Sequence, residues 1–393
     1  MPRTLTSSAT GISFPTRGLS FPFNWTCLKI ENHHETRRCQ NGAKYQLARP
    51  QLKKFDDMIS QATQWTFETN SNTVRVSFWA GRGWFSLFDI NLFVMTFMAT
   101  SVFAESEIEQ RLDARRAFGY LEEICKLGPR PSASEGMTQQ QELIVEHFTK
   151  LKASVSFQNF DTPHPKKGTP VRMRNLIVSW HPQAKERVLL CCHYDTRPFP
   201  DRDAFRPKGT FLGANDGASG VALFMEMGHS LPKLNPTYGV DMVFFDGEEF
   251  IFERDGGKYF LGSEYFAQQY RDRPPAHRYV CGVLVDMIGD KNLSIPQEKN
   301  SLKFAPELTR SIWETARTLG IKEFVAKPKI EINDDHIPLN EIAKIPTTDL
   351  IDFDYPAWHT TKDKPSECSG TSLVKVARVL LTWLEQVPME VGR

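Results

Sequence analysis

"VDMVFFDGEEF", residues 240–250, joins an apolar run to a tight Asp-Gly turn and then to two adjacent glutamates. The apolar run has the length and composition of a buried β-strand. Because neighbouring carboxylates repel each other, Glu248 and Glu249 add nothing to stability unless a positive charge lies beside them. The stretch therefore predicts a buried strand whose end needs a source of positive charge.

Similar apolar runs recur along the chain and alternate with segments of helical periodicity. The predicted strands cover residues 175–181, 187–193, 240–246 and 280–289, and the predicted helices cover 108–128, 139–153, 220–234 and 372–387. Continuous apolar strands between helices indicate a central, mostly parallel (mixed) twisted sheet with helices on both faces. We therefore predict an α/β fold whose ligand site lies beyond the carboxyl ends of the strands.

Composition narrows the class of protein. The chain has 393 residues with 48 Lys+Arg and 47 Asp+Glu, a net charge of +1, so no overall field favours nucleic acid or an anionic membrane surface. Its cysteines show no CxxC pair, and so predict neither a thiolate zinc cluster nor a disulfide framework. Cys191 and Cys192 lie in a predicted strand, where we expect them to pack on opposite faces.

The N-terminal part of the chain differs from the rest. Residues 1–83 lack strand or helix periodicity, and we expect little stable structure there. Residues 84–104 follow Arg82, are strongly apolar and end in small residues, which is typical of a secretory signal, although the position is too far along the chain. Three interpretations follow. The segment is a membrane anchor, although Asp89 and Asn91 count against a membrane span, or the true start of the protein lies downstream of residue 1, which we favour. The third interpretation is a buried helix of the main domain.

This organisation predicts a catalytic domain over residues 105–390 that works outside the cytoplasm, as a secreted, periplasmic or membrane-anchored protein. Membrane contact would occur only through residues 84–104, if that segment is not cleaved.

Imidazole and carboxylate side chains fall where the predicted strands end. Each of these residues taken alone more often caps a helix or pairs with a surface charge; Asp216, for example, would suit the N-terminus of the helix that begins near Gly220. Together with the carboxylate pair they favour a divalent metal, and mixed nitrogen and oxygen ligands suit catalytic zinc. The strand-end residues are His193, Asp195, Asp216, Glu248, Glu249, Asp286 and His359.

The motifs that contain these residues resemble a known family. "CCHYDTRP", "GANDGASGVA", "FFDGEEF", "VDMIGD" and "YPAWHTT" occur in the order and spacing of the zinc-dependent M28 peptidases, and most resemble the glutaminyl-peptide cyclotransferase (glutaminyl cyclase) branch. The resemblance covers about residues 112–387 and implies a single catalytic domain of the zinc-aminopeptidase-like (phosphorylase/hydrolase-like) fold.

The resemblance also implies the site residues. One zinc ion would be bound by Asp216, Glu249 and His359, and a second ion, as in the two-zinc aminopeptidases, would add His193 and Asp286. Glu248 corresponds to the catalytic acid and base. Adjacent side chains diverge at a strand end, so one glutamate binds the metal while the other faces the substrate.

Further residues favour the cyclase branch. "INDDHIP" matches a cyclase segment in which Asp334 forms an acidic relay with Asp286 and Ile332 lines the substrate pocket, and Trp358 and Tyr355 match pocket positions. The chain departs from animal cyclases at three positions, and "GANDGASGVA" reads more like the peptidase version of its loop. These positions are Arg254 in place of a pocket Trp, Val221 in place of a disulfide partner of Cys192, and Asp349 in place of a pocket His.

The sequence thus predicts a zinc-dependent enzyme that converts the N-terminal glutamine of peptides or proteins to pyroglutamate and releases ammonia. The first alternative is a zinc aminopeptidase on the same scaffold, because both enzymes share the metal ligands. The second is a non-catalytic binding protein derived from the fold, which the intact carboxylate pair and ligand set disfavour.

Overall fold

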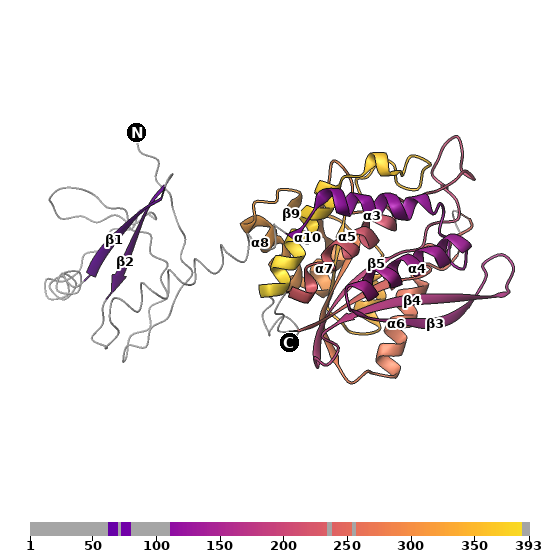
Figure 1. The fold of residues 1–393 in the computed structure, drawn as a ribbon, viewed down its shortest axis with the longest axis horizontal. Helices are drawn as coiled ribbons and strands as arrows, with labels where there is room; N and C mark the ends of the chain where they lie inside the picture. The colour runs from indigo at the N-terminus through magenta and orange to yellow at the C-terminus, as the bar shows by residue number, and fades with distance from the viewer. Residues whose placement is uncertain (1–61, 70–71, 80–110, 234–237, 254–256, 387–393) are drawn as a thin grey trace. The chain divides into compact units, whose positions relative to one another are not determined.

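The computed structural model describes residues 62–69, 72–79, 111–233, 238–253 and 257–386. The chain divides into two compact units, Met1–Val94 and Met95–Arg393, and each is described by itself. In the first unit, strands β1 (Ala62–Thr69) and β2 (Asn72–Trp79) form an antiparallel pair (Figure 1). This pair lies within residues 1–83, where little structure was expected; the apolar segment 84–104 is outside the described residues.

The second unit is built on a six-stranded sheet with the order β10-β7-β5-β6-β4-β3. Strands β10, β7, β5 and β6 are parallel to one another, whereas β4 is antiparallel to β6 and β3 is antiparallel to β4. The predicted mostly parallel, mixed sheet is therefore confirmed. Its strands are β3 (Ser154–Pro163), β4 (Pro170–Trp180), β5 (Glu186–His193), β6 (Gly239–Phe245), β7 (Arg278–Asp286) and β10 (Thr347–Ile351).

Helices cover both faces of this sheet (Figure 1). Val188, Leu190 and Cys192 of β5 point into the larger core. This core also contains residues of α3 (Ala114–Lys126), α4 (Glu135–Lys150), α5 (Ala218–Met227), α8 (Pro306–Thr318) and α10 (Gly370–Gln386). Leu189 and Cys191 alternate with these β5 residues and point into the smaller core, with α6 (Leu261–Asp272) and α9 (His336–Glu341), so the two cysteines face opposite sides as predicted.

The start of α3 shows how local chemistry sets an element's bounds. The helical pattern in the sequence begins at residue 108, but α3 begins at Ala114 because the Asp113 carboxylate accepts hydrogen bonds from the backbone N–H groups of Arg115 (2.8 Å) and Arg116 (3.2 Å). Likewise α5 ends at Met227, before the predicted residue 234.

A smaller layer flanks β10. Helix α7 (Lys299–Phe304) contacts β10, and α8 (Pro306–Thr318) packs on α10, while β8 (Ile295–Glu298) and β9 (Phe324–Ile330) form a separate parallel pair. Short 3-10 turns occur at Leu231–Lys233 (η1) and Pro365–Glu367 (η2). Among the described residues, every helix is too short or too polar to cross a lipid bilayer.

The described cysteines, Cys125, Cys191, Cys192, Cys281 and Cys368, are all buried and unpaired. Cys192 is thus free, as its replaced disulfide partner led us to expect.

Candidate active site and metal centre

The parallel strands end at one edge of the sheet, and the residues predicted from their ends gather there. His193 is the last residue of β5, Asp286 is the last of β7, and Glu248 and Glu249 follow β6. Asp216 lies in the loop that enters α5, and His359 lies in the loop after β10. Segments far apart in the chain are therefore neighbours in space.

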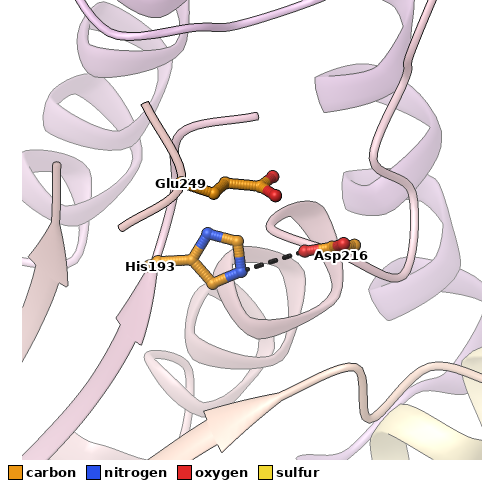
Figure 2. A group of neighbouring side chains, drawn as sticks. All are labelled: His193, Asp216 and Glu249. Carbon is orange, nitrogen blue, oxygen red and sulfur yellow. Dashed lines mark ion pairs between the residues drawn. The ribbon is translucent and has the colours of Figure 1, made fainter. Parts of the chain in front are cut away.

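Asp216 lies at the centre of the group. Its Oδ1 is 3.3 Å from His193 Nε2, and its Oδ2 is 3.4 Å from His359 Nε2. His193, Asp216 and Glu249 each offer one atom that could bind a metal, and these three atoms lie within 4.8 Å of one another (Figure 2). His359 Nε2 is also 3.2 Å from Glu249 Oε2, and His193 Nε2 is 3.1 Å from Asp286 Oδ1. All five side chains predicted to bind metal thus converge on one place.

The group fits a divalent cation. Asp216 Oδ2 is buried and has no hydrogen-bond donor, although a buried carboxylate oxygen needs a partner. The carboxylates of Asp216, Glu249 and Asp286 share the site with two imidazoles, and a doubly charged ion would offset their repulsion. Imidazole nitrogen and carboxylate oxygen are ligands that suit zinc.

The adjacent glutamates are separated by their backbone. The Asp195 carboxylate accepts hydrogen bonds from the N–H groups of both Glu248 (3.0 Å) and Glu249 (3.2 Å), and so fixes the turn after β6. Glu249 is turned inward, where its Oε1 accepts a hydrogen bond of 2.6 Å from the backbone of Arg197. Both carboxylates line the cavity, but only Glu249 belongs to the group of side chains that could bind a metal, and Glu248 is the less buried of the two. The division into a metal ligand and a proton carrier stays a prediction.

A glycine allows the Asp216 loop to lie this close. Gly217 has φ +96°, and a Cβ at this position would lie 2.7 Å from the carbonyl oxygen of Asp195. Only glycine adopts this backbone conformation without strain and leaves room for the Asp195 segment.

Asp216, Glu249, Asp286 and His359 line a cavity with a volume of about 510 Å³; these four side chains and His193 are called the metal group below. Its lining includes most of the residues predicted to act on or bind the substrate, namely Glu248, Asp286, Ile332, Asp334 and Trp358. Tyr355 is the exception: it is buried behind the wall, its hydroxyl donates to Asp363 Oδ1 (2.8 Å), and it lines an adjoining hollow instead. Arg254, where animal cyclases place a Trp, lies outside the described residues.

Burial shifts the acid–base behaviour of this cavity. It raises the pKa of Glu248 well above its ordinary value, and the nearby carboxylates of Asp334 and Glu249 add to the effect. Burial and then the Asp286 charge raise the pKa of Asp334 in the same direction. Burial opposes protonation of His359, but contacts with Asp201 and Glu249 raise its pKa to about 9. Without a cation, the site therefore holds protons near neutral pH.

Three polar residues that support the site were not predicted. Asp201 Oδ1 is 3.1 Å from His359 Nδ1, and the buried guanidinium of Arg197 approaches both Asp201 (3.0 Å) and Glu249 (3.7 Å). Asp363 accepts hydrogen bonds from the backbone of Asn215 (2.8 Å) and Asp216 (3.2 Å). The motif "HYDTRP" contains Arg197, but Asp201 and Asp363 lie well inside the loops after β5 and β10, where the sequence gives no comparable signal.

Comparison with known proteins identifies the family of this chain. The family described as Peptidase family M28 matches residues 175–384, more than half of the chain. The chain belongs to peptidase family M28.

Relatives within this M28 family include glutaminyl cyclases and an aminopeptidase. The crystal structure of Fimbriiglobus ruber glutaminyl cyclase is similar at 40% identity and a TM-score of 0.68, covering 70% of this chain and 95% of that one. A structure described as a leucine aminopeptidase precursor from Bacteroides thetaiotaomicron shares 30% identity, with a TM-score of 0.66 and coverage of 70% and 98%. Bovine glutaminyl-peptide cyclotransferase is 27% identical over 52% of this chain, and the match spans 64% of the bovine protein's length.

Proposed function

We propose that this M28 protein is a zinc-dependent glutaminyl-peptide cyclotransferase, which forms pyroglutamate from the N-terminal glutamine of peptides or proteins and releases ammonia. The observation that carries the proposal is the position of Glu248: it faces a cavity walled by Ile332 and Trp358, next to the group of metal-binding side chains. The similarity to glutaminyl cyclases over nearly the whole of one solved structure supports it.

The reaction needs no water, because both reacting groups belong to the glutamine. Its α-amine attacks the side-chain amide carbon, the new C–N bond closes the lactam ring, and the bond to the amide nitrogen breaks to release ammonia. Glu248 accepts the proton that the amine loses and returns it to the leaving nitrogen. Burial raises the pKa of Glu248, which favours its protonated form.

The other cavity residues have supporting roles in this proposal. Ile332 and Trp358 enclose the glutamine side chain. Asp286 and Asp334, whose pKa values burial raises, hold a proton between them and donate hydrogen bonds as charge develops at the reacting amide. Zinc held by Asp216, Glu249 and His359 would supply a Lewis acid beside the cavity. His193 and Asp286 offer ligands for a second ion.

Two further expectations belong to this proposal. Peptide or protein N-termini are the partners, and the catalytic domain covers residues 105–390. We also infer that the protein acts outside the cytoplasm, and this inference rests on the apolar segment 84–104 alone.

A zinc aminopeptidase is the second candidate, supported by the similarity to the Bacteroides leucine aminopeptidase precursor and by the complete set of five ligand side chains. An assay of the zinc-loaded protein on a Gln-initiated dipeptide amide separates the two. We expect ammonia and a pyroglutamyl product without free glutamine. Release of free glutamine would favour the aminopeptidase, and absence of both products would favour a non-catalytic binding protein.

A further inference from the structure

A second hollow adjoins the catalytic cavity on the far side of Trp358. It has a volume of about 670 Å³ and is open to the surface. Asp201, Arg202 and Trp358 line both spaces, so the hollow lies next to the place where the N-terminal glutamine is proposed to bind. The remaining lining is Asp203, Ala204, Pro207, Tyr355, Pro356 and Thr360.

The loop that forms one side of this hollow, residues 202–208, is firmly held. The buried Asp203 carboxylate accepts backbone hydrogen bonds from Phe205 (3.0 Å), Arg206 (2.8 Å) and Thr361 (3.0 Å). The Arg202 N–H donates to the carbonyl oxygen of His359 (3.1 Å). The loop is thus bound to the segment that carries Trp358 and His359.

This fixed loop presents an aromatic ring and cations to solvent. Phe205 is 94% exposed, although it lies on a loop whose backbone is hydrogen-bonded. Arg202, Arg206 and Lys208 are exposed, and the guanidinium of Arg202 lies 3.9 Å from the ring centre of Trp358. The acid of the loop, Asp203, is buried and already saturated with donors. Residues 202–208 therefore present a positive, partly apolar surface.

The other acidic side chains near the hollow offset little of the positive charge of loop 202–208. Glu331 lines the catalytic cavity rather than the hollow, and Asp354 forms an ion pair with Lys329. Asp201 already has partners of its own, because its Oδ1 lies 3.0 Å from Arg197 Nε and 3.1 Å from His359 Nδ1.

We propose that loop 202–208 and the adjoining hollow form a subsite for the residues that follow the N-terminal glutamine, and that it selects peptides with an acidic side chain next to an apolar one. The inference rests on the proposed function, because the glutamine must occupy the catalytic cavity. Phe205, Arg206 and Lys208 belong to the loop and not to the lining of the hollow, so they would meet peptide side chains that lie over the loop. An acidic side chain would lie near Arg206 and Lys208, and an apolar one would cover the ring of Phe205.

The test measures binding, so that it does not depend on turnover. The zinc-loaded Glu248→Gln variant is titrated calorimetrically with the peptide amides Gln-Glu-Phe-Ala and Gln-Lys-Phe-Ala. We expect the acidic peptide to bind about three- to fivefold more tightly, the effect of one exposed ion pair. Adding Lys208→Glu should abolish or reverse the ratio, and adding Phe205→Ser should weaken both peptides. Lys126→Glu, the same charge change at an exposed position on α3 that lines neither space, should leave the ratio unchanged.

The outcomes separate the two proposals. Equal affinities, or a ratio that survives Lys208→Glu, would overturn the subsite, as would failure of both peptides to bind. If the acidic peptide is preferred but the unmodified enzyme forms no pyroglutamate from either, the subsite stands and the cyclase function fails.

Discussion

Glu248 and Glu249 show how one backbone turn can give neighbouring residues different tasks. Asp195 accepts hydrogen bonds from the N–H groups of both, and both carboxylates line the cavity, but only Glu249 lies within the group of side chains that could bind a metal. A cation beside Glu249 would offset the repulsion between them, which protonation offsets when no cation is bound.

The first prediction follows from this division. Glu248→Gln should lower kcat for Gln-initiated peptides by roughly 10²–10⁴-fold, because it removes the proton carrier, while zinc content stays at the unmodified level. Steady-state kinetics and metal analysis of the same preparation measure both. Glu253→Gln, at an exposed position a few residues on, is the control and should leave both values unchanged. Loss of zinc from Glu248→Gln would contradict the assignment of Glu249 as the ligand.

Asp201 gives a second prediction at this scale. Its carboxylate lies 3.1 Å from His359 Nδ1, so it orients the ring and leaves Nε2 free to bind metal. Asp201→Asn should weaken zinc binding by about 10- to 100-fold in competition with a chromogenic chelator. Asp161→Asn, which alters a surface ion pair with Arg172, should not weaken it. An unchanged zinc affinity in Asp201→Asn would contradict the role of Asp201 in orienting His359 for metal binding.

The sequence identifies some residues of the site more readily than others. His193, Asp286, Glu248 and Glu249 could be predicted because strand ends at one edge of a parallel sheet must meet. Asp363 could not, because its partners, the backbone N–H groups of Asn215 and Asp216, lie more than a hundred residues away in the chain. Such contacts depend on loop conformation, which hydrophobic periodicity does not encode.

At the scale of elements, α7 and β8 fix one wall of the catalytic cavity. Glu298, at the end of β8, accepts a hydrogen bond from Ile332 N–H (3.0 Å), and the Asn300 side chain donates to the Ile332 carbonyl (2.9 Å). Both backbone polar groups of a pocket residue are thus held by side chains from outside its own loop.

We therefore expect Asn300→Ala to loosen this wall. The KM for Gln-initiated peptides should rise several-fold, with a smaller change in kcat, because the substrate loses a fixed surface while Glu248 keeps its place. Asn292→Ala, which removes an exposed amide between β7 and β8, is the matched control. A fall in kcat at constant KM would argue against a role in shaping the pocket.

Helix α4 carries a histidine that makes stability depend on pH. His147 Nε2 lies 2.9 Å from the Met225 carbonyl of α5, and its ring packs edge-on against Tyr120 and His229. Burial lowers the pKa of His147 from 6.5 to about 4, so between these values the unfolded chain binds more protons than the folded one. The contribution of this residue is fully present above pH 6.5 and is lost as the pH falls toward 4.

The measurement is the free energy of unfolding of metal-free protein at pH 7.5, 6 and 5. His147→Gln should lose less stability than the unmodified chain as the pH falls, whereas the exposed His181→Gln should follow the unmodified chain. Parallel curves for His147→Gln and the unmodified chain would exclude His147 as the titrating group.

Elements differ in how well the sequence predicts them. Strands β5, β6 and β7 are buried along nearly their whole length and appear as continuous apolar runs. Strand β3 is mostly exposed at the edge of the sheet and lacks such a run. Helix α8 was also missed, although Leu308, Ile312 and Ala316 recur at helical spacing behind a proline at its start.

At the scale of the whole molecule, the chain gathers the proposed metal ligands from the ends of β5 and β7 and from the loops that follow β6 and β10 and enter α5. The strands are fixed by the two apolar cores on either side of the sheet, which contain none of the proposed metal ligands. The loops at the sheet edge, in contrast, bring Asp216, Glu249 and Asp286 together at an electrostatic cost.

The last prediction is that zinc stabilises the folded protein through this group. Free zinc at a thousand times its dissociation constant should raise the free energy of unfolding by about 4 kcal/mol, because the unfolded chain lacks the convergent ligands. Denaturant unfolding with zinc and with excess chelator measures the difference. Asp216→Ala should lose both bound zinc and this stabilisation, since Asp216 contacts both imidazoles, whereas Asp161→Asn should retain both. Equal stability with zinc and with chelator, or an unchanged zinc content in Asp216→Ala, would mean that these carboxylates gather for a reason other than binding a cation.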